Sequence, residues 1–310
     1  MREVALREVF GETLVELGER YPNLLVLDGD LANSTKADRF EAAFPERFLE
    51  MGIAEQNLVG VAAGLAHLGF IPWLSSFTVF FTHRAADPLR MLVAQTHANV
   101  KIGAAYSGLL TGYTGKTHQD VEDLAIMRAM PDMVVLAPLD AVEARAMMHW
   151  ATAYEGPVYL RLARDPSPVV LPEDYAFTPG QILTLREGKD VALVGTGVQT
   201  ARLLEARDLL AKAGIEAGVF HVGSLKPLDE AALVDALGPY RVVFTAEEHS
   251  IYGGLGGLVA EVLGENDPKP VHRIGIEDRW GESAPNDWLL EHYGLSAKKV
   301  AERVLKEVKA

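Results

Sequence analysis

A single carboxylate, Glu55, stands at the start of a long uncharged stretch of this chain. Residues 56–83 contain no Asp, Glu, Lys or Arg. Continuous apolar stretches with small residues are typical of elements that are buried on more than one face. A carboxylate beside such a stretch is costly to ionise unless a specific partner uses it. Glu55 is therefore a candidate catalytic or ligand-binding acid, although a helix-initial Glu favoured by the helix dipole explains the position equally well.

Three further groups of residues could contribute to the same chemistry. Phe77 and Phe80 lie three residues apart, His118 follows a Gly-rich segment, and Arg164 follows the apolar run 158–162. Each has an ordinary alternative, namely core packing, a polar helix start and surface solvation. In an open α/β sheet, however, the loops at the carboxyl ends of the strands converge on the ligand crevice. We therefore expect Glu55, Phe77, Phe80, His118 and Arg164 to form one site.

The elements that must position these residues follow from the spacing of apolar side chains. In the first part of the chain, helical spacing and short apolar runs alternate. The pattern predicts helices at 4–20, 54–68, 82–94, 118–130 and 141–153, and strands at 24–27, 70–76, 100–105, 133–137 and 158–162. Alternation of this kind indicates an α/β fold with a mostly parallel sheet.

The chain is long enough for two domains. We predict a first domain at 1–170, a linker at 171–189 within the stretch 165–188 that is rich in Pro and polar groups, and a smaller α/β domain at 190–310. In the second domain the pattern predicts strands at 191–195, 217–222 and 241–246, and helices at 198–214, 229–237, 253–264 and 297–308.

Composition excludes several classes of function. The 29 Lys and Arg against 43 Asp and Glu give a net charge of −14, which disfavours binding to nucleic acid or to anionic membranes. The absence of Cys excludes disulfides and thiolate chemistry and fits a cytoplasmic protein. The first residues mix both charge signs, unlike a signal peptide. Polar residues and Pro72 within the uncharged stretch favour buried elements over a membrane span.

Four motifs together resemble the pyrimidine-binding half of transketolase, and residues 190–310 resemble the C-terminal domain that follows it in that family. The motifs are GIAEQN at 52–57, SFTVFF at 76–81, GKTHQDVEDLA at 115–125 and GPVYLRLARDP at 156–166. The resemblance covers essentially the whole chain but includes no diphosphate-binding domain. It implies one subunit of a split transketolase that uses thiamine diphosphate. A partner subunit would hold the diphosphate and Mg²⁺ or Ca²⁺, in an assembly of two copies of each chain.

The resemblance also implies roles for residues at the cofactor. Glu55 matches the acid that pairs with N1′ of the aminopyrimidine and favours its imino form, so that the cofactor loses the C2 proton and attacks a ketose carbonyl. Phe77 and Phe80 match the aromatic residues around the pyrimidine, and His83 stands where the family often has Tyr. Asp30 and Leu31 match a segment that lines the cofactor cleft. No metal ligand is expected in this chain.

Other matches concern the substrate. His118 matches a substrate-facing His that can bind or transfer a proton at the reacting hydroxyl. Arg7, Ser34 and Arg164 match the residues that hold the phosphate of the sugar. Many transketolases carry His where this chain has Tyr106 and Asp where it has Thr114; both positions line the substrate. These departures leave the identity of the sugar open.

Other readings of the sequence remain. A β-type subunit of a 2-oxoacid dehydrogenase shares the domain pair and the Glu, and a deoxyxylulose-phosphate-synthase-like enzyme shares the motifs but is normally a longer chain. A catalytically silent scaffold or regulatory subunit is a reading of a different class. Intact Glu55, Phe77, Phe80 and His118 argue against the scaffold.

Overall fold

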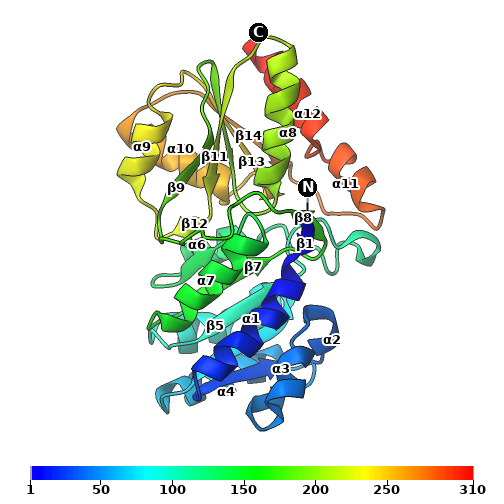
Figure 1. Cartoon of the computed structure of the whole chain (residues 1–310), viewed down its shortest axis with the longest axis vertical. Coiled ribbons are helices and arrows are strands. Elements are labelled where there is room, and N and C mark those ends of the chain that lie inside the picture. Colours follow the sequence, from blue (N-terminus) through cyan, green and yellow to red (C-terminus); the bar gives the residue numbers. More distant parts are fainter. Residues whose placement is uncertain (1, 310) are drawn as a thin grey trace.

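The computed structural model describes residues 2–309, which form two α/β domains, one below the other in Figure 1. In the first, helices and strands alternate along the chain. Its elements are β1 (Glu3–Ala5), α1 (Leu6–Arg20), β2 (Leu24–Asp28), α2 (Ala32–Thr35), α3 (Asp38–Ala43), β3 (Phe48–Glu50), α4 (Glu55–His67), β4 (Ile71–Phe77), α5 (Ala86–Pro88), β5 (Lys101–Ala105), α6 (Asp123–Ala129), β6 (Val134–Leu136), α7 (Ala141–Ala153), β7 (Val158–Leu162) and β8 (Pro166–Pro168).

Short helices complete the first domain. Turns of 3-10 helix form η1 (Pro45–Arg47) and η4 (Gly112–Thr114), and π-helical turns form η2 (Phe80–Arg84) and η3 (Leu89–Ala94). The predicted helix at 82–94 is thus a run of η2, α5 and η3. Pro88 has no N–H to donate inside this run, which explains why regular helix is interrupted there.

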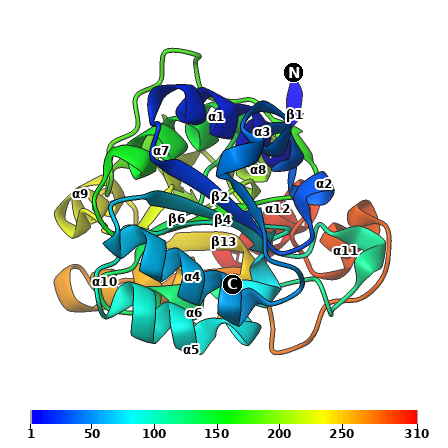
Figure 2. The same cartoon turned by 90° about the horizontal axis from the view of Figure 1, so that it is seen from below.

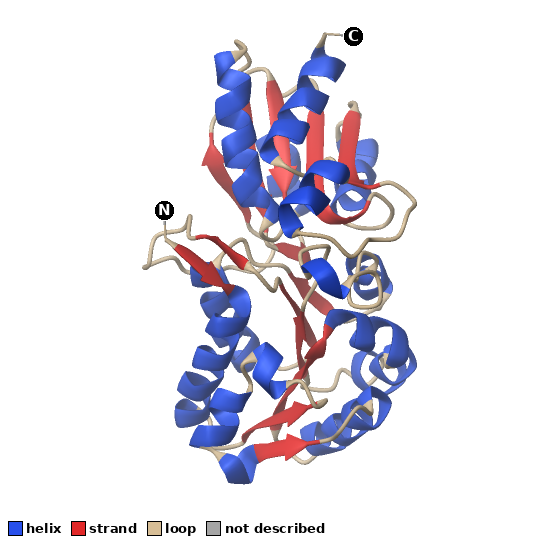
Figure 3. Ribbon diagram, turned by 90° about the vertical axis from the view of Figure 1, so that its right-hand side faces the viewer, coloured by secondary structure: helices blue, strands red, loops and turns tan. Residues whose placement is uncertain are grey.

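The C-terminal domain contains β9 (Ile182–Arg186), β10 (Val191–Gly195), α8 (Gln199–Lys212), β11 (Ala217–Val222), β12 (Ser224–Lys226), α9 (Glu230–Leu237), β13 (Val243–Ser250), α10 (Leu255–Asn266), β14 (Val271–Ile276), α11 (Asn286–His292) and α12 (Ala297–Val308). In Figure 3 the strands of each domain lie between helices. The α/β class predicted from the alternating pattern is therefore confirmed.

The sheet of the first domain has the order β12-β6-β7-β5-β4-β2-β3, and its strands are parallel except β12. Central strands β2 and β4 are buried along their whole length, which is why they read as nearly continuous apolar runs. Figure 2 shows α1, α3 and α7 on one face of this sheet and α4, α5 and α6 on the other. Helices on both faces are what parallel crossovers require.

The segment predicted as a linker is partly built into sheets. Strand β9 lies within 171–189 and pairs antiparallel with β11 at the edge of the five-stranded C-terminal sheet, β14-β13-β10-β11-β9. Just before the segment, β8 pairs with β1. The sequence pattern did not reveal β9, because its Ile182–Arg186 run is short and only partly buried. The second half of the predicted linker thus belongs to the C-terminal sheet.

A second difference concerns the helix predicted at 118–130. Regular helix begins only at Asp123. The side chain of Gln119 donates to the carbonyls of Leu109 and Glu282, and Ser107 forms an isolated β-bridge with Asp120. These long-range contacts hold residues 107–122 as a loop against the C-terminal domain, and local periodicity does not reveal them.

The two domains interlock. Strand β12 comes from the C-terminal half of the chain but pairs with β6 of the first sheet. Buried Arg161 on β7 donates to Asp123 at 2.7 Å and to the carbonyl of Glu248 on β13 at 2.9 Å. His221 on β11 lies 2.8 Å from Glu143 on α7. Because these polar groups are buried in pairs, the interface fixes one relative position of the domains.

Among residues 2–309, no helix is both long enough and apolar enough to cross a membrane. The uncharged stretch 56–83 runs through α4, β4 and most of η2, and the apolar side chains of these elements pack in the core of the first domain.

The interlock yields a stability prediction. Arg161→Met should lower the free energy of unfolding by about 3–5 kcal/mol, because it leaves Asp123 buried without its cation. Urea unfolding followed by circular dichroism measures the change. Arg145→Met is the matched control, since its ion pair with Glu16 is half-exposed and should contribute less than about 1 kcal/mol. Equal small effects of the two variants would contradict the assignment.

Candidate functional site

Loops from three neighbouring strands meet at one edge of the first sheet. Connections from β2 lead outward to β3, whereas those from β4 lead the other way to β5, so the chain diverges between β2 and β4. A crevice forms at such a point outside the carboxyl ends of the strands. Residues 28–31 follow β2, Phe77 and η2 end or follow β4, and Tyr106 follows β5. The structure therefore brings together segments that the sequence placed at separate strand ends.

Glu55 is the first residue of α4 and is only 2% exposed. Its carboxylate is not alone: Nη1 of Arg84 donates to both carboxylate oxygens, at 3.2 and 3.3 Å. Arg84 is 47% exposed and its guanidinium lies 3.9 Å from the centre of the Phe80 ring. Glu55 is thus a buried acid, as the sequence indicated, but one that faces a planar cation stacked on an aromatic ring.

An aromatic stack runs from this pair into the domain. Phe80 and Phe77 are stacked with ring centres 5.7 Å apart, and Phe77 is stacked on Tyr106 at 3.9 Å. Arg164 lies over the far ring, 5.2 Å from the centre of Tyr106. His118 meets Phe77 and Phe80 edge-on at 5.8 and 5.5 Å. The predicted aromatic residues therefore form one continuous wall.

A cavity of about 280 Å³ lies in front of this wall. The predicted residues among those that line it are Asp30, Leu31, Glu55, Phe80 and His118; the others are Gly29, Ile53, Arg84 and Thr117. Burial and, second, the charge of Arg84 lower the pKa of His118. A neutral imidazole can both donate and accept a hydrogen bond, which suits a group that exchanges protons.

The loop after β2 carries a second buried acid that sequence reasoning passed over. Oδ1 of Asp28 accepts from the backbone N–H of Leu31 at 2.6 Å, while its buried Oδ2 has no hydrogen-bond partner in the described part of the chain. Burial raises the pKa of Asp28 to about 6. Asp30 has φ 65°, a left-handed conformation that Asp tolerates better than most residues. The Asp28 turn sets the direction of Asp30 and Leu31 toward the cavity.

The predicted phosphate grip forms a second group behind the aromatic stack. Nη1 of Arg7 donates to the Tyr106 hydroxyl at 3.2 Å and to the backbone carbonyl of Ser34 at 3.3 Å. Arg164 is held by Asp165 at 2.9 Å. Tyr106 itself has φ 59°, unusual for an aromatic residue. Two arginines, Ser34 and a phenol are therefore gathered at one place, although Arg7 contacts the backbone of Ser34 and not its hydroxyl.

Two predicted residues lie apart from the cavity. His83 points to Glu122, with Nε2 to Oε2 at 3.2 Å. Thr114 donates to Thr111 and lines a different hollow of about 450 Å³, shared with Arg164 and with Asn286 of the C-terminal domain. Thr114 is therefore placed near the arginine end of the site, while His83 lies at its rim beside Glu55 and Arg84.

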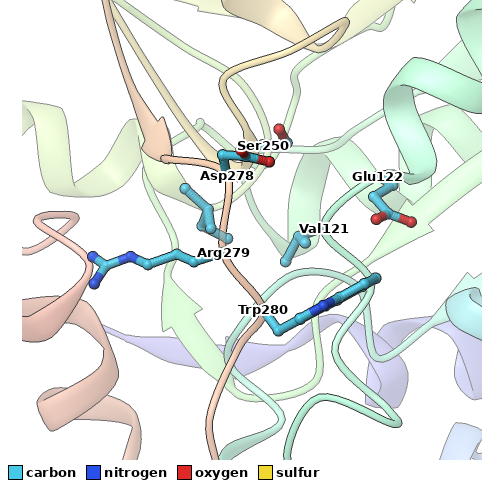
Figure 4. A pocket seen from close by; sticks show the side chains of 7 residues that line it. Val121, Glu122, Ser250, Asp278, Arg279 and Trp280 are labelled. Carbon is cyan, nitrogen blue, oxygen red and sulfur yellow. The ribbon is translucent and has the colours of Figure 1, made fainter.

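Two other features of the described residues carry no part of this chemistry. A cavity of about 170 Å³ between the domains is lined by Val121, Glu122, Ser250, Ile276, Asp278, Arg279 and Trp280 (Figure 4). It contains none of the predicted residues. His83, Asp120 and Glu122 bring their ligand atoms within 4.8 Å of one another. Since Asp120 already accepts from Thr82 and from the backbone of Glu122, we assign no metal to this group.

Arg84 is the main residue that sequence reasoning missed. It is the first charged residue after the uncharged stretch that Glu55 opens, so the two charges that bound the stretch pair with each other. The position of Glu55 and Arg84 at the two ends of the uncharged stretch was a sequence signal that could have suggested their pairing. It was not decisive, because a contact between residues 29 positions apart depends on how α4 and η2 pack.

Comparison with known proteins identifies the two domains. Residues 2–168 match the transketolase pyrimidine-binding domain, and residues 180–300 match the transketolase C-terminal domain. A putative transketolase C-terminal section of Methanocaldococcus jannaschii is 42% identical over 98% of this chain and 96% of its own length. A 6-deoxy-6-sulfo-D-fructose transketolase subunit of a Clostridium strain is 40% identical, over 97% of this chain and 93% of its own.

Among solved structures, one described as a split-gene transketolase, inactive β4 tetramer, superposes with a TM-score of 0.90 at 47% identity. It covers 99% of both chains. Two of these relatives are described as a transketolase subunit and as a split-gene transketolase, and the two matched domains account for nearly all of this chain. The chain belongs to the transketolase family, as a subunit that carries the pyrimidine-binding and C-terminal domains of a split transketolase.

Proposed function

We propose that this chain, together with a partner subunit, transfers a two-carbon ketol unit from a ketose phosphate to an aldose phosphate with thiamine diphosphate as cofactor. The observation that carries the proposal is the buried carboxylate of Glu55 beside the Phe80 ring in a cavity that His118 also lines. An acid, an aromatic face and a proton-transfer group are the parts that an aminopyrimidine and a sugar hydroxyl need from the protein.

The residues present fit the pyrimidine end of the cofactor. A planar, nitrogen-rich cation already lies between Glu55 and Phe80, namely the guanidinium of Arg84. An aminopyrimidine would use the same two contacts, a ring nitrogen toward the carboxylate and a ring face on the phenyl group. When bound, thiamine diphosphate supplies a carbon nucleophile for the ketose carbonyl.

The side chains of this chain would divide the work as follows. Glu55 holds or shares a proton at the ring nitrogen of the pyrimidine, which its burial favours because a buried carboxylate gains most from a hydrogen-bonded partner. Phe80 and Leu31 shape the slot and exclude water from it. His118, held edge-on against the aromatic wall, is placed to move a proton at a hydroxyl of the substrate.

A partner subunit is part of the proposal. The matched domains are the pyrimidine-binding and C-terminal ones, and the similar structure is described as an inactive tetramer of β chains. We infer that a second polypeptide holds the diphosphate together with Mg²⁺ or Ca²⁺, and that two copies of each chain assemble.

The far end of the substrate is proposed to be anionic. Arg7 donates to the hydroxyl of Tyr106 and Arg164 lies over its ring, and the guanidinium geometry suits bidentate binding of phosphate or a similar oxyanion. The Clostridium relative is named for a sulfonated ketose, whose end group is also an oxyanion. Because the chain has a net charge of −14, an anionic group would be repelled unless local cations held it, and these two arginines can supply that attraction.

Removal of the acid tests the catalytic role. Glu55→Ala should reduce ketol transfer by the reconstituted complex about 10²–10⁴-fold, because the proton at the pyrimidine nitrogen loses its partner. Steady-state assays with thiamine diphosphate and Mg²⁺ measure the loss. Glu46→Ala, at a side chain that is 71% exposed, is the control and should retain activity. Full activity of Glu55→Ala would favour the silent-scaffold reading instead.

Dependence on the partner can be tested directly. The purified chain alone should show no ketol transfer and should bind thiamine diphosphate poorly, because it supplies contacts only to the pyrimidine end. Activity should appear when the diphosphate-binding subunit is added and should saturate at an equimolar ratio. Robust activity without a partner would contradict the two-subunit assignment.

The role of Arg164 at the anionic end of the substrate can be tested by comparing phosphorylated and unphosphorylated substrates. Arg164→Ala should raise KM for a phosphorylated ketose about 10-fold or more, in line with the loss of a charged hydrogen bond, and should change KM for an unphosphorylated ketose such as erythrulose less than about 2-fold. Arg186→Ala, on exposed β9, is the control. An equal effect on both substrates would show that Arg164 does not contact the anionic end.

A further inference from the structure

We propose that the Arg84 side chain fills the pyrimidine slot, the space between the Glu55 carboxylate and the Phe80 ring, in the free subunit. Arg84 must then move out of this slot when the cofactor binds. This inference rests on the proposed function, because it assigns Glu55 and Phe80 to the aminopyrimidine. Arg84 would compete with the cofactor for the same contacts, and this competition would lower the apparent affinity for the cofactor.

Both contacts of Arg84 are ones the cofactor would need. Its Nη1 lies 3.2 and 3.3 Å from the two carboxylate oxygens of Glu55, so neither oxygen is left free on that side. Its guanidinium lies 3.9 Å from the centre of the Phe80 ring, a stacking distance that leaves no room for a second planar group between them. Arg84 and a pyrimidine bound by Glu55 and Phe80 therefore exclude each other.

The side chain is also free to leave. Arg84 is 47% exposed, whereas Glu55 is 2% exposed, so the guanidinium already borders solvent and the carboxylate does not. In the described part of the chain, the guanidinium of Arg84 donates hydrogen bonds to no residue other than Glu55. Solvent screens this ion pair from the arginine side, and the long arginine side chain loses entropy when it is held in one position. The closure is therefore reversible on binding.

The main chain at Arg84 is held in place, so the side chain can move without it. Arg84 ends the π-helical turn η2, and the Gln56 side-chain amide donates to its carbonyl at 3.0 Å. The neighbouring Ala85 is fully buried. The main chain is thus anchored to α4 while the guanidinium alone has to move.

The test measures binding and not only turnover. Thiamine is titrated calorimetrically into the full chain, and thiamine diphosphate with Mg²⁺ into its complex with the diphosphate-binding subunit. If Arg84 closes the slot in about 80–90% of molecules, Arg84→Ala should tighten both apparent dissociation constants about 5- to 10-fold. Arg90→Ala, at an exposed arginine six residues further along the same helical run, should change neither.

A competitor provides a second readout. In Arg84→Ala, free guanidinium ion should weaken thiamine binding, because it can enter the vacated place, whereas sodium at the same ionic strength should not. In the unsubstituted chain guanidinium should have less effect. Arg84→Lys should fall between the two, since an ammonium keeps the charge but cannot stack as a plane.

The outcomes separate the two proposals. If Glu55→Gln abolishes thiamine binding but Arg84→Ala leaves it unchanged or weaker, the occupant role of Arg84 is refuted while the proposed function stands. If Glu55→Gln has no effect on binding in either background, the pyrimidine lies elsewhere and the proposed function fails as well. Tighter binding in Arg84→Ala together with loss on Glu55→Gln supports both.

Discussion

The site depends on keeping one carboxylate out of water. Glu55 lies at the start of α4 with 2% of its surface exposed, where an ionised acid is stable only if a cation or a hydrogen-bond donor faces it. In the free chain that partner is Arg84, and in the proposed complex it is the pyrimidine of the cofactor. Phe80 of the aromatic wall and His118 line the same cavity as this acid, so their proposed roles depend on it.

Sheet topology explains why the acid has the right neighbours. Since the connections diverge between β2 and β4, the turn at Asp28, the end of β4 at Phe77 and the residue after β5, Tyr106, open onto the same edge. The stack from Phe80 through Phe77 to Tyr106 then links the cavity beside Glu55 to the arginine end of the site. Its rings are supported by one another, so the distance between the two ends is fixed by packing.

The C-terminal domain contributes to the site by holding parts of the first domain in place. It completes the first sheet with β12 and holds the 107–122 loop through Gln119 and Glu282. The buried pair of Arg161 and Asp123 lies at the start of α6, directly after that loop, and also reaches β13. His118 is carried by the loop, so the position of a catalytic candidate depends on contacts with a domain that does not line the cavity around Glu55.

The sequence by itself determined the α/β class, five of the seven strands of the first sheet and the candidate status of Glu55, because buried strands and an uncharged stretch leave a local pattern. The motifs around Glu55, Phe77 and His118 were also local, and they sufficed to indicate the family. Only the tertiary structure decided that Arg84 faces Glu55, that β9 and β12 join sheets, that α6 starts at Asp123 and that His83 turns toward Glu122. Each of these is set by contacts between residues far apart in the chain, and such contacts arise from packing that no short window of sequence contains.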